Sequence, residues 1–509
     1  MNSLKELKGN IKKSMILFFF IFKNKKNIFW NLFGGLWLAA LILISTPFYL
    51  SKLGFDLFGV FSLWMVLQVM MNLFDFGLGS TIIKDFSASN GVTSYSYKAD
   101  LLRSIEIFYW IIAVIIFSIL LVFSAYISSD WIILSSETDV DLVLIMTLMS
   151  ITLFFQFPNL LYLNGLSGLQ EHVLMNVVQI IGNSLRYGSG IIILFWYADL
   201  IWFFGAQIFV AAMQTFFTRY VLWKKLTFSQ RVTPIFRFEL LKQSSKFSFG
   251  MAMTSICAVL LANVDRIGIS MLLSASELGK YAIAFTATGL LQLGIQPFYR
   301  TYFPRYSELY SKGEIIKLRR EYLVSTMMIA SILVPLGSIG FFFAEGIFFV
   351  WLGINDVTIV NIFKLLLIGI TCSGLCWLPA AFQQAQGWTS LHVKMLLGAL
   401  LIGTPCMFWA INNFGVYGAS IVWLIHGVSN VTLGLWLMHR RLLIGEFVWW
   451  YKSVILPPVL ITIPMIYLSL FLMPSDLSKL GTLIWVGLTA IFVMFGVGML
   501  GVRKLKSNF

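Results

Sequence analysis

Apolar runs follow one another along almost the whole chain, separated by charged or turn-rich breaks. A helix that crosses a bilayer needs roughly 20 predominantly apolar residues. By that measure the pattern predicts an all-α, polytopic membrane protein with about fourteen spanning helices, at residues 29–50, 57–79, 105–127, 141–163, 173–196, 200–222, 247–272, 280–299, 323–343, 361–383, 393–412, 415–437, 453–473 and 481–501.

Composition supports this class and narrows the chemistry. Of the 509 residues, 59% are hydrophobic and 11% are charged, which is far from the composition of soluble domains. The four cysteines, Cys257, Cys372, Cys376 and Cys406, all fall in apolar runs. Neither they nor His392 have the spacing of metal ligands, so we predict buried thiols, no metal site and no resident cofactor.

The first 27 residues differ from the rest because they carry seven lysines around a short apolar stretch, residues 15–22. That stretch is too short to cross a bilayer, and no small-residue cleavage site follows it before Ile28. We predict that residues 1–27 form a basic cytoplasmic segment with an interfacial helix held against anionic headgroups.

Basic residues gather in alternate loops. With the N-terminus inside, only Lys52, Lys280 and Lys479 lie in outer loops, while dense basic groups at 219–246 and 300–320 lie inside. Cytoplasmic loops hold the excess of Lys and Arg, so the bias predicts an even number of spans with both termini cytoplasmic. The formal charge of +14 then follows from topology, and we expect the lipid bilayer, not nucleic acid, as the partner of these loops.

The connecting loops are short, at most about 20 to 25 residues, and too short to fold as domains. A glycosyltransferase or ATPase head would need a much longer soluble segment. The nucleotide-binding motif GxxxxGK[ST] does not occur in the sequence. The pattern therefore predicts a transporter that is neither an enzyme nor driven by a P-loop ATPase.

A short motif occurs twice, about six predicted helices apart. Leu50–Phe61 and Leu273–Tyr281 both contain an acidic residue, then Leu, Gly and an aromatic residue. The repeat suggests two six-helix lobes, 28–245 and 246–452, followed by two further helices and a basic tail in 453–509. Transporters built from such repeats bind their substrate between the repeats, near the bilayer midplane.

These residues resemble those of a known superfamily, the multidrug/oligosaccharidyl-lipid/polysaccharide (MOP) flippases. Within it the chain is most similar to the bacterial polysaccharide or O-antigen flippases of the Wzx type. The similarity rests on helix number and order and on four short segments, Leu53–Gly59, Leu73–Gly79, Asn263–Ile267 and Glu277–Ala282.

The resemblance implies two helical lobes that open alternately to each side of a bacterial inner membrane. Its implied cargo is an undecaprenyl-diphosphate-linked oligosaccharide, and we expect a monomer, with polysaccharide polymerase machinery as a candidate partner. Peptidoglycan-precursor flippases of the superfamily carry arginines in the first helix that resemble a diphosphate trap. The predicted first helix, 29–50, has no Arg or Lys, which argues against the peptidoglycan precursor as cargo.

Ionisable residues inside predicted spans are candidates for function, because each costs about 2.5–3.5 kcal/mol to insert. Arg186 lies near the middle of the fifth predicted helix, and Asp265 and Arg266 lie in the seventh. A guanidinium suits a diphosphate or an acidic sugar, so we predict that Arg186 and Arg266 contact cargo. The alternatives are an ion pair between helices or a side chain that reaches the interface.

Three other charged residues complete the predicted site. Asp75 and Asp265 are candidates for a coupling H⁺ or Na⁺, although Asp75 is also placed to accept hydrogen bonds at a helix end. Arg300 and Arg305 flank Pro304 at the inner end of the eighth predicted helix, where a lipid-linked diphosphate would arrive. Topology alone also accounts for these two arginines.

Two other functions remain open on sequence alone. A cation-coupled drug exporter of the same superfamily would usually stop at twelve helices, so the two additional helices favour lipid cargo. A membrane polysaccharide polymerase or ligase usually has a sizeable outer loop with Arg and His. The longest outer loop here, 128–141, has four acidic residues but neither Arg nor His.

Overall fold

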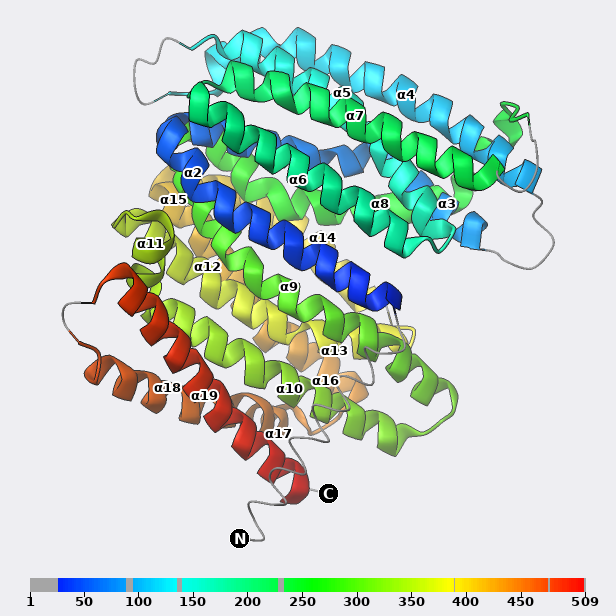
Figure 1. Cartoon of the computed structure of the whole chain (residues 1–509). Helices are drawn as coiled ribbons and strands as arrows, with labels where there is room; N and C mark the ends of the chain where they lie inside the picture. The colour runs from blue at the N-terminus through cyan, green and yellow to red at the C-terminus, as the bar shows by residue number, and fades with distance from the viewer. Residues whose placement is uncertain are drawn as a thin grey trace. The chain divides into compact units, whose positions relative to one another are not determined.

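The computed structural model describes residues 26–87, 95–134, 140–227, 233–388, 390–474 and 477–507. Nearly all of them are helical (Figure 1). Within these ranges the structure contains no β-strand, only one isolated bridge between Ile133 and Ser274. The predicted interfacial helix at 15–22 lies outside the described residues.

The helices keep the labels of Figure 1, and several are joined through a short 3₁₀ or π-helical turn, labelled η. In chain order they are α2 (Lys26–Met70), η1 (Met71–Asp75), α3 (Leu78–Ser87), α4 (Tyr95–Tyr126), η2 (Ile127–Trp131), α5 (Leu142–Gly168), α6 (His172–Trp196), α7 (Leu200–Thr227), α8 (Phe238–Leu272), α9 (Ala275–Ser311), α10 (Ile315–Phe342), α11 (Ala344–Leu352), α12 (Val357–Leu375), α13 (Trp377–Ala385), α14 (Ser390–Gly398), η3 (Ala399–Gly403), α15 (Thr404–Ser429), η4 (Asn430–Gly434), α16 (Leu435–Leu442), α17 (Phe447–Trp450), η5 (Tyr451–Ile455), α18 (Leu456–Phe471) and α19 (Lys479–Ser507).

Each of the fourteen predicted spans is mostly helical. Among the described residues, ten stretches are long and apolar enough to cross a membrane. Two of them, Phe33–Asp75 and Ser390–Leu442, hold two predicted spans each, and α8 and α9 hold the remaining two. The prediction of an all-α polytopic membrane protein is confirmed.

Glycines mark where two long helical stretches change direction. Gly54 interrupts α2 with φ +70°, and Gly415 interrupts α15 with φ +58°. A residue with a side chain rarely adopts such angles, so glycine permits the break between consecutive spans. The predicted span 57–79 is itself interrupted, because Phe76 and Gly77 have φ of 47° and 74° and α3 begins only at Leu78.

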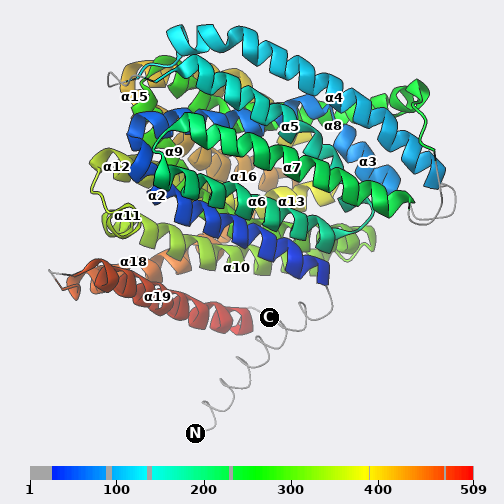
Figure 2. The same ribbon diagram turned by 45° about the horizontal axis from the view of Figure 1, so that its top comes forward.

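The chain forms two compact units, each described here by itself. Unit 1 comprises Met1–Leu53, Gln68–Asp130 and Asp139–Ile256. Within it α5 packs against α3, α4 and α7, and α7 also packs against α6 (Figures 1 and 2). Buried aromatic side chains fill this core, including Tyr109 stacked on Phe157 at 4.9 Å between ring centroids.

Unit 2 comprises Gly54–Leu67, Trp131–Thr138 and Cys257–Phe509. In it α12 packs against α9, α10 and α15, while α18 and α19 pack against each other and against α10. Figures 1 and 2 both place α18 and α19 side by side. The last two predicted helices therefore join this unit through α10 and, from α19, also through α11.

The two copies of the repeated motif meet inside unit 2. A β-carbon on Gly59 would lie 1.8 Å from the carbonyl oxygen of Ala275, and one on Gly279 would lie 2.5 Å from that of Phe55. Real β-carbons do not approach so closely, so both glycines are required for this helix crossing. The glycine shared by the two motifs thus has the same role in each copy.

Candidate functional site

Asp265 is completely buried in unit 2, on α8. Its Oδ2 accepts hydrogen bonds from the Tyr281 hydroxyl at 2.6 Å and from the Trp423 indole Nε1 at 2.7 Å. Its Oδ1 accepts from the backbone N–H of Arg266 at 2.8 Å. Three helices, α8, α9 and α15, therefore hold one carboxylate with uncharged donors. Tyr281 is the aromatic residue that ends the second copy of the repeated motif.

Arg266 follows Asp265 but is only loosely paired with it. The closest approach, from Nε to Oδ1 of Asp265, is 4.0 Å, too long for a hydrogen bond. The guanidinium lies over the Phe285 ring at 4.4 Å and donates one hydrogen bond, from Nη2 to the Ala262 carbonyl at 3.2 Å. Its buried Nε has no hydrogen-bond partner among the described residues. Most of the donors of Arg266 are thus unused.

Arg186 lies in unit 1, near the middle of α6. It donates a long hydrogen bond to the Gln214 side chain, 3.4 Å from Nη2 to Oε1, while its buried Nε has no partner in the described ranges. No described carboxylate forms an ion pair with it. A guanidinium in a membrane span without a counter-charge is costly, which is the usual mark of a group kept for function.

Asp75 ends the 3₁₀ turn that precedes α3, also in unit 1. Its carboxylate accepts hydrogen bonds from the backbone N–H of Gly79, at 3.0 and 3.3 Å, and from the Tyr109 hydroxyl. It therefore satisfies a free N–H group in the first turn of α3. Ion coupling at Asp75 would have to compete with these bonds.

Arg300 and Arg305 are exposed on the last turns of α9. Arg305 pairs with Glu308 at 3.1 Å and with Glu321 at 3.9 Å. Arg300 forms no ion pair within the described part of the chain. Within unit 2, Asp265 and Arg266 lie together as sequence neighbours on α8, whereas Asp75 and Arg186 belong to unit 1.

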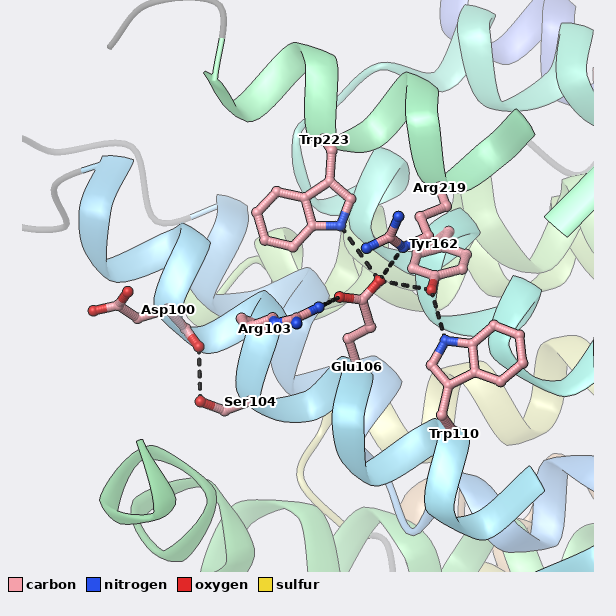
Figure 3. Close-up of polar contacts among 8 residues, drawn as sticks. All are labelled: Asp100, Arg103, Ser104, Glu106, Trp110, Tyr162, Arg219 and Trp223. Atoms are coloured by element: carbon pink, nitrogen blue, oxygen red, sulfur yellow. Dashed lines mark hydrogen bonds and ion pairs between the residues drawn. The ribbon is translucent and has the colours of Figure 1, made fainter. Parts of the chain in front are cut away.

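The structure reveals a second buried carboxylate that the sequence reasoning missed, Glu106 on α4 (Figure 3). It is 1% exposed. Its Oε1 accepts from Arg219 Nε at 2.5 Å, from the Tyr162 hydroxyl at 2.8 Å and from Trp223 Nε1 at 3.4 Å. Its Oε2 accepts from Arg103 Nη1 at 3.0 Å. Tyr162 in turn accepts from the Trp110 indole at 3.2 Å.

Asp100, one and a half turns before Glu106 on α4, is also buried. It accepts from the backbone N–H of Ile235 at 2.8 Å and pairs with Arg237 Nε at 3.0 Å. The neighbouring Ser104 accepts from the backbone N–H of Arg237 at 2.8 Å. The segment before α8 is therefore fastened to α4 within unit 1.

Comparison with known proteins places the chain in a family. A family model described as "Polysaccharide biosynthesis protein" matches residues 25–310, more than half of the chain. The chain belongs to this family. A relative from Shigella flexneri, named "Putative O-antigen transporter", is 24% identical over 428 residues, which is 83% of this chain and 99% of the relative.

Solved structures of flippases and transporters share the fold of this chain. The Lipid II flippase MurJ, in an inward closed conformation, matches with a TM-score of 0.74, 14% identity, and 94% and 99% coverage of the two chains. An inward-facing multidrug resistance MATE family transporter of the MOP superfamily matches with a TM-score of 0.60, 14% identity, and 82% and 94% coverage. The predicted resemblance to the MOP superfamily is confirmed.

The membrane spans of this chain hold a small number of ionic groups that can bind a charged ligand. Among the described residues, no group of three or more His, Cys, Asp or Glu side chains is placed to hold a metal ion. What the spans offer is an uncompensated guanidinium at Arg186, a loosely paired one at Arg266, and a buried carboxylate beside the latter. Such groups can bind an anion and exchange a cation or proton.

Proposed function

We propose that this protein moves an undecaprenyl-diphosphate-linked oligosaccharide, the repeat unit of O-antigen or another surface polysaccharide, from the cytoplasmic to the periplasmic leaflet. The observation that carries the proposal is the pair of guanidiniums, Arg186 and Arg266, with unused donors inside membrane spans of a member of the polysaccharide biosynthesis family. The name of the Shigella relative and the flippase fold support the same class of cargo.

In this mechanism the two predicted lobes, 28–245 and 246–452, open alternately to each side of the inner membrane, with both termini cytoplasmic. Arg300 and Arg305 receive the lipid-linked diphosphate at the inner surface. Arg186 and Arg266 then replace the water that the diphosphate loses on entering the membrane. Planar guanidiniums suit this task because each presents several donors to phosphate oxygens.

Asp265 is the better of the two candidates for ion coupling. Its hydrogen-bond donors are uncharged, so its negative charge is compensated only by Arg266 at 4.0 Å. A proton or Na⁺ can therefore compete for it, and cargo that engages Arg266 would change that competition. We propose that an ion gradient or the membrane potential drives transport through this linkage.

The decisive experiment is deletion of the gene in its host, followed by complementation and a measurement of the sidedness of lipid-linked intermediates in membrane vesicles. We expect loss of surface polymer, with complete repeat units confined to the cytoplasmic leaflet, and recovery with the wild-type gene. Repeat units that reach the periplasmic face but stay unpolymerised would instead indicate a polymerase or ligase. Unchanged polysaccharide with a changed drug tolerance would indicate a drug exporter.

A further inference from the structure

The Glu106 cluster carries more positive charge than its own pairing requires. Arg103 and Arg219 both bind the one carboxylate of Glu106. No other described carboxylate pairs with either arginine. One guanidinium would neutralise a buried Glu, so the second leaves a net charge of about +1 at the cluster. A surplus charge at the edge of a membrane span is stable only beside water or an anion.

The Glu106 carboxylate also accepts hydrogen bonds from uncharged donors, so it does not need two arginines for its own stabilisation. Tyr162 and Trp223 donate to the same Oε1 that accepts from Arg219, and Trp110 fixes the Tyr162 hydroxyl (Figure 3). These bonds fix Glu106 in place, and it in turn fixes a guanidinium nitrogen on each of its two oxygens. The two cations are therefore held close together before any ligand arrives.

Both guanidiniums keep donors beyond those that bind Glu106, and both side chains are partly exposed. Each carries five N–H groups; Arg103 donates one hydrogen bond to another described residue, Glu106, and Arg219 interacts with Glu106 and Tyr162. The Arg103 side chain is 40% exposed and that of Arg219 is 38% exposed, whereas Glu106 beneath them is buried. An anion can thus reach the arginines without displacing Glu106.

The expected depth of Arg103 and Arg219 in the membrane indicates which kind of anion they bind. Arg103 lies two residues before the first residue of the predicted span 105–127, and Arg219 lies at the inner end of the predicted span 200–222. Both positions fall where headgroup phosphates lie, and Trp110 and Trp223 are the aromatic residues expected at that level. Phosphate oxygens match the planar donor fork of arginine. A phosphate at this depth is therefore sufficient to account for the two arginines.

We propose that Arg103 and Arg219, held in place by Glu106, form a binding site for a lipid-borne phosphate at the inner end of unit 1. The ligand is either the headgroup of an anionic phospholipid or the diphosphate of a polyprenyl lipid. The site is separate from Arg186, Arg266, Arg300 and Arg305, and binding can be measured without transport. It therefore does not depend on the proposed function.

The test measures lipid binding to the purified full-length protein in a neutral detergent, by microscale thermophoresis. The probes are phosphatidylglycerol and undecaprenyl diphosphate, with diacylglycerol as a reference that lacks phosphate. The test variant is Arg103→Gln together with Arg219→Gln. Lys224→Gln is the matched control, because Lys224 carries the same charge on the same helix but lies over Tyr220, not on Glu106.

We expect the double variant to bind lipid phosphate about tenfold more weakly, and Lys224→Gln to bind within about twofold of wild type. Loss for undecaprenyl diphosphate alone assigns the site to a polyprenyl carrier, and loss for both lipids assigns it to headgroups in general. Equal losses in the double variant and the control would overturn the proposal, as would no loss in either.

A second double variant, which keeps both positive charges, tests the proposal if the glutamine variant does not fold. Arg103→Lys with Arg219→Lys retains both positive charges and an ion pair to Glu106 but removes the planar fork. We expect about threefold weaker binding of the same two probes, since ammonium groups bind phosphate as point charges. Binding equal to wild type would show that charge alone attracts the lipid, and the site as proposed would be wrong.

Discussion

Glu106 in unit 1 and Asp265 in unit 2 are buried beneath the same kinds of side chain, yet the two carboxylates are neutralised in opposite ways. Glu106 in unit 1 and Asp265 in unit 2 are 1% and 0% exposed, and each accepts from one tyrosine and one tryptophan. Glu106 also binds two arginines at 2.5 and 3.0 Å. Asp265 has one, at 4.0 Å.

That difference separates a group built for stability from one built for exchange. A carboxylate held by two guanidiniums gains nothing from a further cation, and removing it exposes two charges. A carboxylate held by neutral donors keeps most of its charge available, and the arginine beside it keeps most of its donors. The comparison is consistent with the two proposals, in which the Glu106 cluster of unit 1 fixes arginines for a lipid-borne phosphate and Asp265 with Arg266 of unit 2 takes part in transport.

The largest expected effect concerns stability. Glu106→Gln should lower the free energy of unfolding by about 2–3 kcal/mol, because the hydrogen bonds from the partly exposed Arg103 and Arg219 lose their anionic acceptor. The matched change Asp265→Asn should cost less, about 1 kcal/mol, since the Asn carbonyl can still accept from Tyr281 and Trp423 and the ion pair to Arg266 that it removes is already 4.0 Å long. Thermal unfolding of the two variants in detergent, followed by tryptophan fluorescence, measures the difference. Equal losses would break the distinction between the clusters.

A smaller effect is expected on transport. Arg266→Ala should slow translocation of the lipid-linked oligosaccharide about tenfold while the protein remains fully inserted, because the donors available to the diphosphate are lost. Lys317→Gln is the control in the same unit, since Lys317 is exposed and paired with Glu314 at 2.7 Å. Initial rates in inverted vesicles report both variants. Normal transport by the inserted Arg266→Ala protein would remove Arg266 from the cargo path.

Hydropathy was sufficient to predict the fold because a bilayer accepts few backbone structures. The predicted spans are mostly helical, since a backbone in lipid must satisfy its own hydrogen bonds. The interruption at Phe76 and Gly77 was not predicted because it lies inside an apolar run and depends on Asp75 reaching the N–H of Gly79. Spans are set by composition, whereas breaks within them are set by single side chains.

The site was only half predictable for a related reason. Asp265 and Arg266 stand out in the sequence because charged residues within a span are rare. Trp423, however, is 158 residues from Asp265, and no local sequence pattern predicts that the two side chains form a hydrogen bond. Glu106 was missed because it is the second residue of its predicted span and follows Arg103, which suggests a loop. The available signal was that Arg219 also lies inside a predicted span, so that two ionisable residues of opposite charge needed partners.

The smallest expected effect compares how much the hydrogen bonds of Trp423 and Trp223 contribute to the free energy of unfolding. Trp423 donates to Asp265 at 2.7 Å, whereas Trp223 donates to Glu106 at 3.4 Å, near the limit of a hydrogen bond. Both indoles are partly buried, so changing either to Phe removes similar packing. Trp423→Phe should therefore cost about 1 kcal/mol more in unfolding free energy than Trp223→Phe, because Asp265 has few other donors and Glu106 has several. A larger loss at Trp223 would mean that the arginines do not satisfy Glu106, and the claim that its cluster has donors to spare for a lipid phosphate would lose its basis.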